Sequence, residues 1–201
     1  MKYSYKPKTR TQLKNLASKI LEAYADRIGE HAVDIERIIE RCKLEIIYRP
    51  MAGIPVEAYI ARNPKYIVVN ERSLYYMPRV RFTLAEELSH RVLEFHLWNN
   101  SDSCIPEGAR VHELTPEQYD EIEHDARHLA AEIMMPEAEF RQRFQQRMVE
   151  MKNLGGNPLI KLVVREVARD FDMSPMAVAY RCKLLKLITK TVYNTEFSIV
   201  L

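Results

Sequence analysis

The chain has 201 residues, of which 47% are hydrophobic and 29% are charged, and its formal net charge is +2. This length predicts one globular domain with a small second module, and the near-balanced charge is no argument for nucleic-acid binding. Cys42, Cys104 and Cys182 stand far apart without a CxxC pair, which argues against a zinc ribbon or a disulfide framework. No run of eighteen apolar residues and no signal peptide is found, so a cytoplasmic protein without membrane contact is expected.

The first third of the chain predicts helices followed by strands. Apolar residues at helical spacing predict a helix over Thr11–Arg27, and Asp34–Arg41 predicts a second. Strands are expected at Leu44–Tyr48, Ala58–Ile60 and Tyr66–Asn70, with turn signals between them. We therefore expect an α+β domain in which a small antiparallel sheet precedes a longer helix.

That longer helix carries a near match to a metallopeptidase motif. Residues 81–90 read RFTLAEELSH. In an HExxH site, two histidines one turn apart bind one metal and the intervening Glu handles protons. Here Glu87 and His90 keep their places, whereas Glu86 replaces the first histidine, so the motif is EExxH.

Helical geometry places Glu86 and His90 on one face. At about 100° per residue the two lie within roughly 40° of each other, in the sector of Leu93 and Leu97, while Glu87 lies off this sector. A buried carboxylate needs a proton, a cation or a metal. Two interpretations remain open: Glu86 and His90 are metal ligands, or they form a hydrogen bond with each other and no metal is present.

A second helix is expected over Tyr119–Met135. Its apolar stripe consists of Ile122, Ala126, Leu129, Ala130, Ile133 and Met134. Glu123 flanks this stripe and is a candidate third ligand. His124 and His128 mimic a metal motif, but both are expected on the solvated side opposite the stripe. His96 and His112 have no partner in the sequence.

The C-terminal part predicts two helices joined by a short turn. The helices are expected over Ile160–Phe171 and Met176–Leu187, with Ser174 as N-cap. This arrangement has helix-turn-helix form, and basic residues decorate the second helix: Arg181, Lys183 and Lys186. Few side chains suited to base recognition remain, so a packing module is favoured and direct DNA binding is not.

Together, RFTLAEELSH, Glu123-x-x-Ala126 and the LAAEIMMP segment ending at Pro136 resemble the ImmA/IrrE family of metallopeptidases. Family members typically show FTLAHELGH followed by ExxANxFAxxLLMP. The resemblance implies a zincin-like peptidase domain over residues 1–150 and a helix-turn-helix-like module over 151–201. It implies Glu87 as general base, and His90 and Glu123 as zinc ligands. It also implies cleavage of a transcriptional repressor in a stress response.

Five positions depart from the family pattern. Glu86 replaces the ligand His, Ser89 replaces Gly, Arg127 replaces Asn and Leu129 replaces Phe, while Glu94 occupies a position that is often His. Glu86 can still ligate a metal through oxygen, and the resulting site of Glu86, His90 and Glu123 would bind zinc or, with its harder ligands, manganese or iron(II). A site without metal is the alternative.

Three hypotheses follow. The first is a metallopeptidase that cleaves a helix-turn-helix repressor. The second is a pseudopeptidase that binds such a repressor without cutting it. The third is a DNA-binding regulator that acts through residues 158–188, which would show salt-dependent DNA binding.

Overall fold

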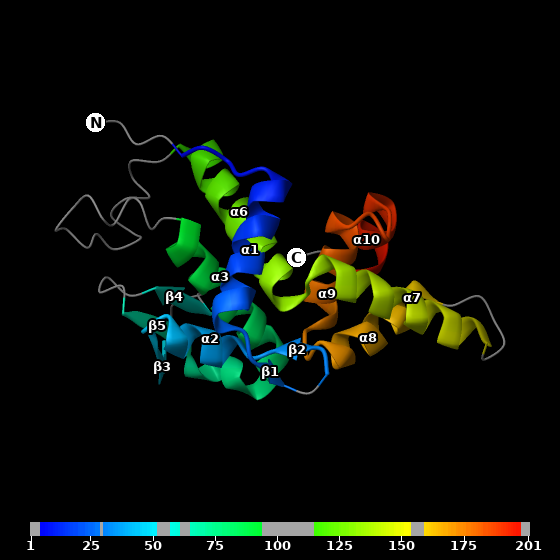
Figure 1. Cartoon of the computed structure of the whole chain (residues 1–201), viewed down its shortest axis with the longest axis horizontal. Helices are drawn as coiled ribbons and strands as arrows, with labels where there is room; N and C mark the ends of the chain where they lie inside the picture. Colours follow the sequence, from blue (N-terminus) through cyan, green and yellow to red (C-terminus); the bar gives the residue numbers. More distant parts are fainter. Residues whose placement is uncertain are drawn as a thin grey trace.

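The computed structural model describes residues 5–28, 30–51, 57–60, 65–93, 115–153 and 159–197. In chain order the elements are α1 (Arg10–Tyr24), β1 (Arg27–Ile28), β2 (Ala32–Val33), α2 (Ile35–Arg41), β3 (Glu45–Arg49), β4 (Ala58–Ile60), β5 (Tyr66–Asn70), the 3-10 helix η1 (Glu71–Tyr76), α3 (Met77–Leu93), α6 (Pro116–Met134), α7 (Glu137–Asn153), α8 (Ile160–Asp170), α9 (Pro175–Leu184) and α10 (Lys190–Glu196). The sheet of β3, β4 and β5 lies toward one end of the molecule, and α7, α8 and α10 lie toward the other (Figure 1). The predicted α+β class is confirmed.

The larger sheet has the order β3-β5-β4. Its β4 and β5 strands pair antiparallel, as predicted, but β3 and β5 pair parallel, so the prediction of a wholly antiparallel sheet was wrong. The reason is topological. Strands β3 and β4 run in opposite directions, as in a hairpin, but β5 inserts between them and takes the direction of β3.

Three helices end in the same way on residues other than glycine. Helix α2 is followed by Lys43, α8 by Asp172 and α9 by Lys186, and these residues have φ of 59°, 50° and 56°. In each case the next amide donates to the carbonyl five residues earlier, as Met173 N does to Ala168 O at 2.9 Å. This is the Schellman motif, whose left-handed position favours glycine because it lacks a Cβ. The backbone carries strain at all three ends.

The start of α9 agrees with the sequence. Ser174 precedes the helix in extended conformation, its hydroxyl accepts from Ala177 N at 3.2 Å, and Pro175 occupies the first turn. The side chain therefore satisfies one of the amides that a helix start leaves unbonded. The predicted cap is confirmed.

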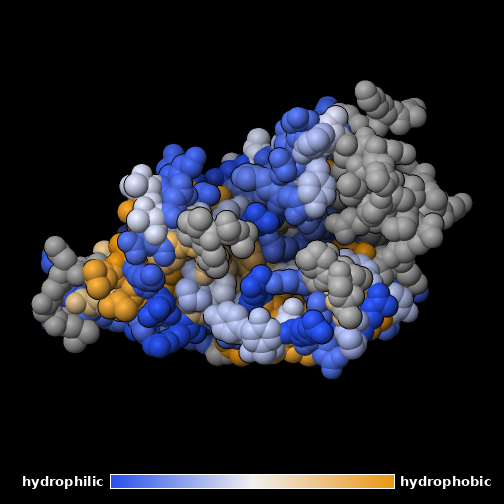
Figure 2. All heavy atoms as spheres, turned by 180° about the vertical axis from the view of Figure 1, so that it is seen from behind, coloured by the Kyte–Doolittle hydropathy of each residue, from blue (hydrophilic) through white to orange (hydrophobic). Residues whose placement is uncertain are grey.

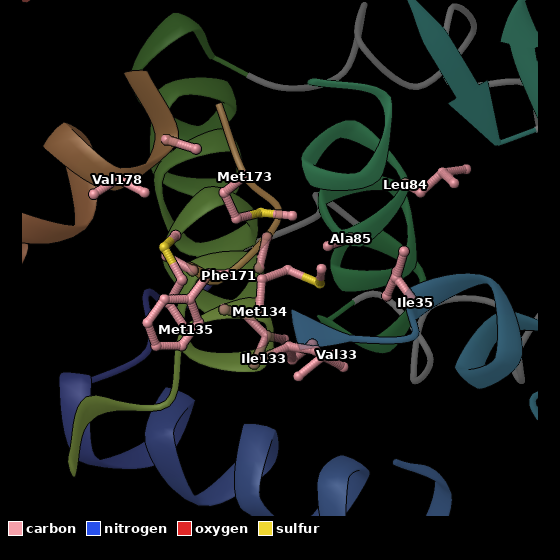
Figure 3. Packing of buried hydrophobic residues seen from close by; sticks show 14 of the residues in the cluster. Val33, Ile35, Leu84, Ala85, Ile133, Met134, Met135, Phe171, Met173 and Val178 are labelled. Atoms are coloured by element: carbon pink, nitrogen blue, oxygen red, sulfur yellow. The ribbon is translucent and has the colours of Figure 1, made fainter. Parts of the chain in front are cut away.

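One hydrophobic cluster connects the N-terminal and C-terminal parts, from Leu13 to Phe197. Figure 3 shows part of it, where buried side chains from β2, α2, α3, α6 and the α8–α9 region belong to one cluster: Val33, Ile35, Leu84, Ala85, Ile133, Met134, Phe171, Met173 and Val178. All the residues of the predicted apolar stripe of α6 are buried, and all of them except Ile122 belong to this cluster. The C-terminal helices are thus part of the same core as the helix that carries the EExxH motif.

A buried arginine links the helix that carries the EExxH motif to β2 and to the turn between α8 and α9. Arg81, on α3, is 4% exposed, and its Nη2 donates to Val33 O. Its Nη1 lies 3.3 Å from the carboxylate of Asp172, in the turn between α8 and α9. This turn is therefore held to α3 by charge as well as by apolar packing.

The exposed apolar residues include a group on α7 and at the start of α8. Val149, Leu159 and Leu162 are 58%, 67% and 44% exposed. Figure 2 shows apolar surface gathered at this end of the molecule. Within the described parts of the chain, no helix combines the length and apolar character needed to cross a bilayer.

Candidate functional site

Helices α3 and α6 face each other through two polar contacts, which we call the ladder. Arg127 Nε donates to Glu86 Oε1 at 2.9 Å, and His90 Nε2 lies 3.4 Å from Glu123 Oε1. The first contact joins Glu86 of α3 to Arg127 of α6, and the second joins the later His90 to the earlier Glu123. The two helices therefore run antiparallel. In each helix the two residues are one turn apart and share a face. The ladder thus brings together the three residues expected as metal ligands, and adds Arg127.

The contact between Glu86 and Arg127 is a half-buried ion pair. The side chains of Glu86 and Arg127 are 22% and 49% exposed. Burial holds the pKa of Glu86 above its usual value; the hydrogen bond and charge of Arg127 and the charge of His90 oppose this shift, and the nearby Glu123 adds slightly to it. The carboxylate therefore needs a cation beside it, and Arg127 provides that cation.

The second contact of the ladder joins His90 and Glu123, whose side chains are 11% and 28% exposed. An imidazole nitrogen and a carboxylate oxygen at this separation face the same point and could share a cation. The third expected ligand, Glu86, is engaged by Arg127 instead. Among the residues that the structure describes, no three His, Cys, Asp or Glu side chains form a group that could hold a metal ion. The arrangement does not fit the expected three-ligand site.

Glu87, the expected general base, is half-buried, and its Oε2 atom is shielded from solvent. In a metallopeptidase this carboxylate acts on a water molecule bound to the metal. Because the ladder does not form a three-ligand set, we derive no catalytic step for Glu87.

The structure adds Tyr180, which no motif in the sequence indicated. Tyr180 lies on α9, and its hydroxyl is buried with no hydrogen-bond partner among the residues that the structure describes. Burial raises its pKa to about 12, against the opposing influence of the Arg127 charge and with a smaller contribution from Glu86. The Tyr180 hydroxyl on α9 is therefore close enough to interact electrostatically with Glu86 and Arg127.

The two histidines of α6 that mimic a metal motif, His124 and His128, differ in their exposure. His124 is 63% exposed in its side chain, as predicted, but the prediction that His128 faces solvent was wrong, because its side chain is only 7% exposed. His128 Nε2 lies 3.6 Å from Glu132 Oε1. The C-terminal half of α6 is covered on more than one face, so polar residues there, such as His128 and Glu132, are buried and compensate one another, whereas His124 stays exposed.

The basic residues expected on the surface of α9 include one that is buried. Arg181 is 0% exposed, and it donates through Nη1 and Nη2 to the two carboxylate oxygens of Glu132 and through Nε to Met135 O at 2.9 Å. The prediction that Arg181 decorates the helix surface was therefore wrong. The helix that would read DNA is largely packed into the core, since Ala177, Val178 and Ala179 on it are also buried.

Several residues considered from the sequence lie outside the described residues, and the structure says nothing about them: Glu94, His96, Leu97, Cys104 and His112. The same holds for the expected joint at residues 155–158.

Comparison with known proteins places this geometry in context. The sequence profile of the peptidase M78 family, described as the IrrE N-terminal-like domain, matches residues 39–183. No curated protein matches the chain. A solved structure described as a Mycobacterium tuberculosis transcriptional regulator is similar, with a TM-score of 0.57 and 14% sequence identity, over 85% of this chain and 46% of that one. The chain thus spans less than half of that protein, and at this identity the likeness concerns the fold alone.

Proposed function

Because the chain belongs to the IrrE N-terminal-like family of peptidase M78, we propose that it uses the fold of this family as a protein-binding domain and does not cut its partner. The partner in this proposal is a helix-turn-helix transcriptional regulator. The observation that carries it is the ion pair between Glu86 and Arg127, in which a carboxylate at a ligand position is already bound to a guanidinium.

The chemistry of the site supports binding without hydrolysis. Zinc peptidases use three protein ligands and leave the fourth position to water. Among the residues that the structure describes, His90 and Glu123 are the two candidate ligands of the ladder that face each other. A fold can keep its shape when one ligand has changed, but the reaction depends on the site itself. We therefore propose that the fold binds a polypeptide and catalyses no reaction on it.

The kind of partner follows from two observations. The family is related to peptidases that act on repressors, and the similar solved structure is described as a transcriptional regulator. The exposed apolar group of Val149, Leu159 and Leu162 supports a protein partner, because apolar surface of this kind is common at protein interfaces. The burial of Arg181 and of one face of α9 argues against direct DNA reading by that helix.

The experiment has two parts. Metal content of the purified protein is measured by elemental mass spectrometry beside a Glu123→Ala variant purified identically. Helix-turn-helix regulators from the same genome are then tested for complex formation, and each partner chain is checked for cleavage by intact mass. We expect no stoichiometric metal in either protein and a complex in which the regulator stays intact. One metal per chain, lost in the variant, together with a cleaved regulator would establish the peptidase instead.

A further inference from the structure

We propose that the guanidinium of Arg127 replaces a metal cation in this fold, and that a latent zinc site formed by position 86, His90 and Glu123 can be opened by two substitutions. The inference rests on the proposed non-cleaving function and deepens it, because it gives a chemical reason why the natural chain would bind a metal poorly at these residues. It concerns the two contacts of the ladder and no other part of the molecule.

The first argument is the position of the positive charge. Glu86 and Glu123 come from different helices and act on each other electrostatically. Two half-buried carboxylates at one interface require a cation between the helices. A metal would bind both helices at once, and Arg127 does the same from α6 by donating to Glu86 on α3. The arginine therefore supplies both the charge and the link between helices.

The second argument is that the two cations exclude each other. Arg127 Nε donates to Glu86 Oε1 at 2.9 Å, so this oxygen is engaged and the charge of the carboxylate is already compensated. A divalent ion at His90 and Glu123 would have only two protein ligands, and it would lie near a fixed positive charge. Binding of zinc to the natural chain is thus opposed by a missing ligand and by repulsion.

The third argument is that the departures at positions 86 and 127 belong together. They are 41 residues apart in sequence, yet their side chains form one ion pair. The family pattern has His and Asn at these positions, which are neutral, and the change to Glu and Arg keeps the summed charge at zero. Each new residue is tolerated because the other is present. We therefore expect that both must be reversed to recover the metal site.

The experiment compares four chains: the natural protein, Glu86→His, Arg127→Asn and the double variant. Each is loaded with zinc, passed through a desalting column and analysed for metal by elemental mass spectrometry, and its thermal unfolding is recorded with and without zinc. We expect one zinc per chain only in the double variant. Its affinity should exceed that of the natural chain by a hundredfold or more, since changes even outside the ligand shell cost 10–100-fold. Zinc at about 1,000 times the dissociation constant should raise its melting temperature by about 10 °C.

Two controls make the result specific. Adding Glu123→Ala to the double variant should abolish zinc binding. The pair Glu166 and Arg169 on α8, with 2.5 Å between Oε1 and Nη1, offers a matched control, because Glu166→His with Arg169→Asn makes the same exchange on an exposed surface. This control should bind no stoichiometric zinc. Circular dichroism and the unfolding curves without zinc show whether each variant is folded.

The proposal is overturned if the folded double variant takes up no zinc, or if Arg127→Asn or Glu86→His alone binds as well as the double variant. Neither of these results affects the proposed function, which concerns the natural chain. If the natural chain itself binds stoichiometric zinc, Arg127 does not replace the metal and this inference fails. The proposed function fails if the natural chain cleaves a regulator, or if it binds none.

Discussion

Arg181 and Glu132 form a buried bidentate ion pair, in which Nη1 donates to Oε1 at 2.8 Å and Nη2 donates to Oε2 at 2.7 Å. The side chains are 0% and 2% exposed. Arg181 lies on α9 and Glu132 on α6, so the pair holds the C-terminal helices against the helix that carries Glu123. Two charges buried at this depth are compatible with folding only as a pair.

We predict that Arg181→Met lowers the free energy of unfolding by about 3–5 kcal/mol, because it leaves the Glu132 carboxylate buried without its cation. The double variant with Glu132→Met should lose less, since both charges are then removed. Urea unfolding followed by circular dichroism measures both values. Arg165→Met, on the exposed face of α8, should change the stability by no more than about 0.5 kcal/mol. A double variant as unstable as Arg181→Met would contradict this account.

The same glutamate predicts a pH dependence of stability. Burial by itself would raise the pKa of Glu132, but the contacts with His128 and Arg181 outweigh it and lower the pKa from 4.5 to about 2. Because the folded pKa is depressed, the stabilisation is fully present above pH 4.5 and is lost as the pH falls toward 2. It amounts to something on the order of 3 kcal/mol.

To test this, the free energy of unfolding is measured between pH 5 and pH 2 for the natural chain and for Glu132→Gln, which cannot ionise. The variant should start lower and fall less steeply across this window. Parallel curves would show that Glu132 does not titrate with the depressed pKa. Glu121→Gln, at an exposed position of α6, should leave the slope unchanged.

Removal of the Tyr180 hydroxyl should stabilise the protein. Within the described part of the chain this hydroxyl is buried with no hydrogen-bond partner, which costs about 1–3 kcal/mol of desolvation. Tyr180→Phe keeps the ring and removes the cost, so we expect a gain of about 1 kcal/mol in urea unfolding. Tyr75→Phe, where the tyrosine is 88% exposed, should have no effect. A loss of stability in Tyr180→Phe would mean that a water molecule or ligand bonds to the hydroxyl.

Glycine should be favourable at the strained helix ends. Lys186 has φ of 56° directly after α9 and is exposed, and Lys43 has the same geometry after α2. Lys186→Gly should raise the melting temperature by a few degrees, in line with a gain of up to about 1 kcal/mol. Arg165→Gly, within α8, should lower stability by about 1 kcal/mol, because glycine is a poor helix former. If both substitutions destabilise alike, the left-handed strain at Lys186 is not significant.

Periodicity was sufficient to predict most elements, because the apolar face of a helix or strand is written within a few consecutive residues. The helix predicted over Asp34–Arg41 is α2, with Asp34 as its cap, and the strand predicted over Tyr66–Asn70 is β5. The partner of a strand is not local information, and for this reason the parallel pairing of β3 with β5 was missed.

The site was predictable only in part, for the same reason. The EExxH spacing and the position of Glu123 beside an apolar stripe indicated two helices that face each other, and the structure brings His90 and Glu123 to 3.4 Å. The role of each residue as ligand or base stays a prediction. No spacing rule connects Glu86 with Arg127, or Glu132 with Arg181, because these contacts depend on how α3, α6 and α9 pack. His128 and Arg181 were expected to face solvent, but α6 and α9 are packed against other helices at these positions, so both side chains are buried.

The contacts that Asp172 and Arg181 make with α3 and α6 have a consequence for truncating the chain. A polypeptide that ends near residue 153 would lack both partners, leaving Arg81 without the Asp172 carboxylate and Glu132 without a guanidinium. It would also uncover the apolar side chains that pack against Phe171 and Val178. Such a fragment should aggregate or be degraded in the expressing cell, and the excised tail should not fold alone. We therefore expect the C-terminal helices to fold only as part of the whole chain.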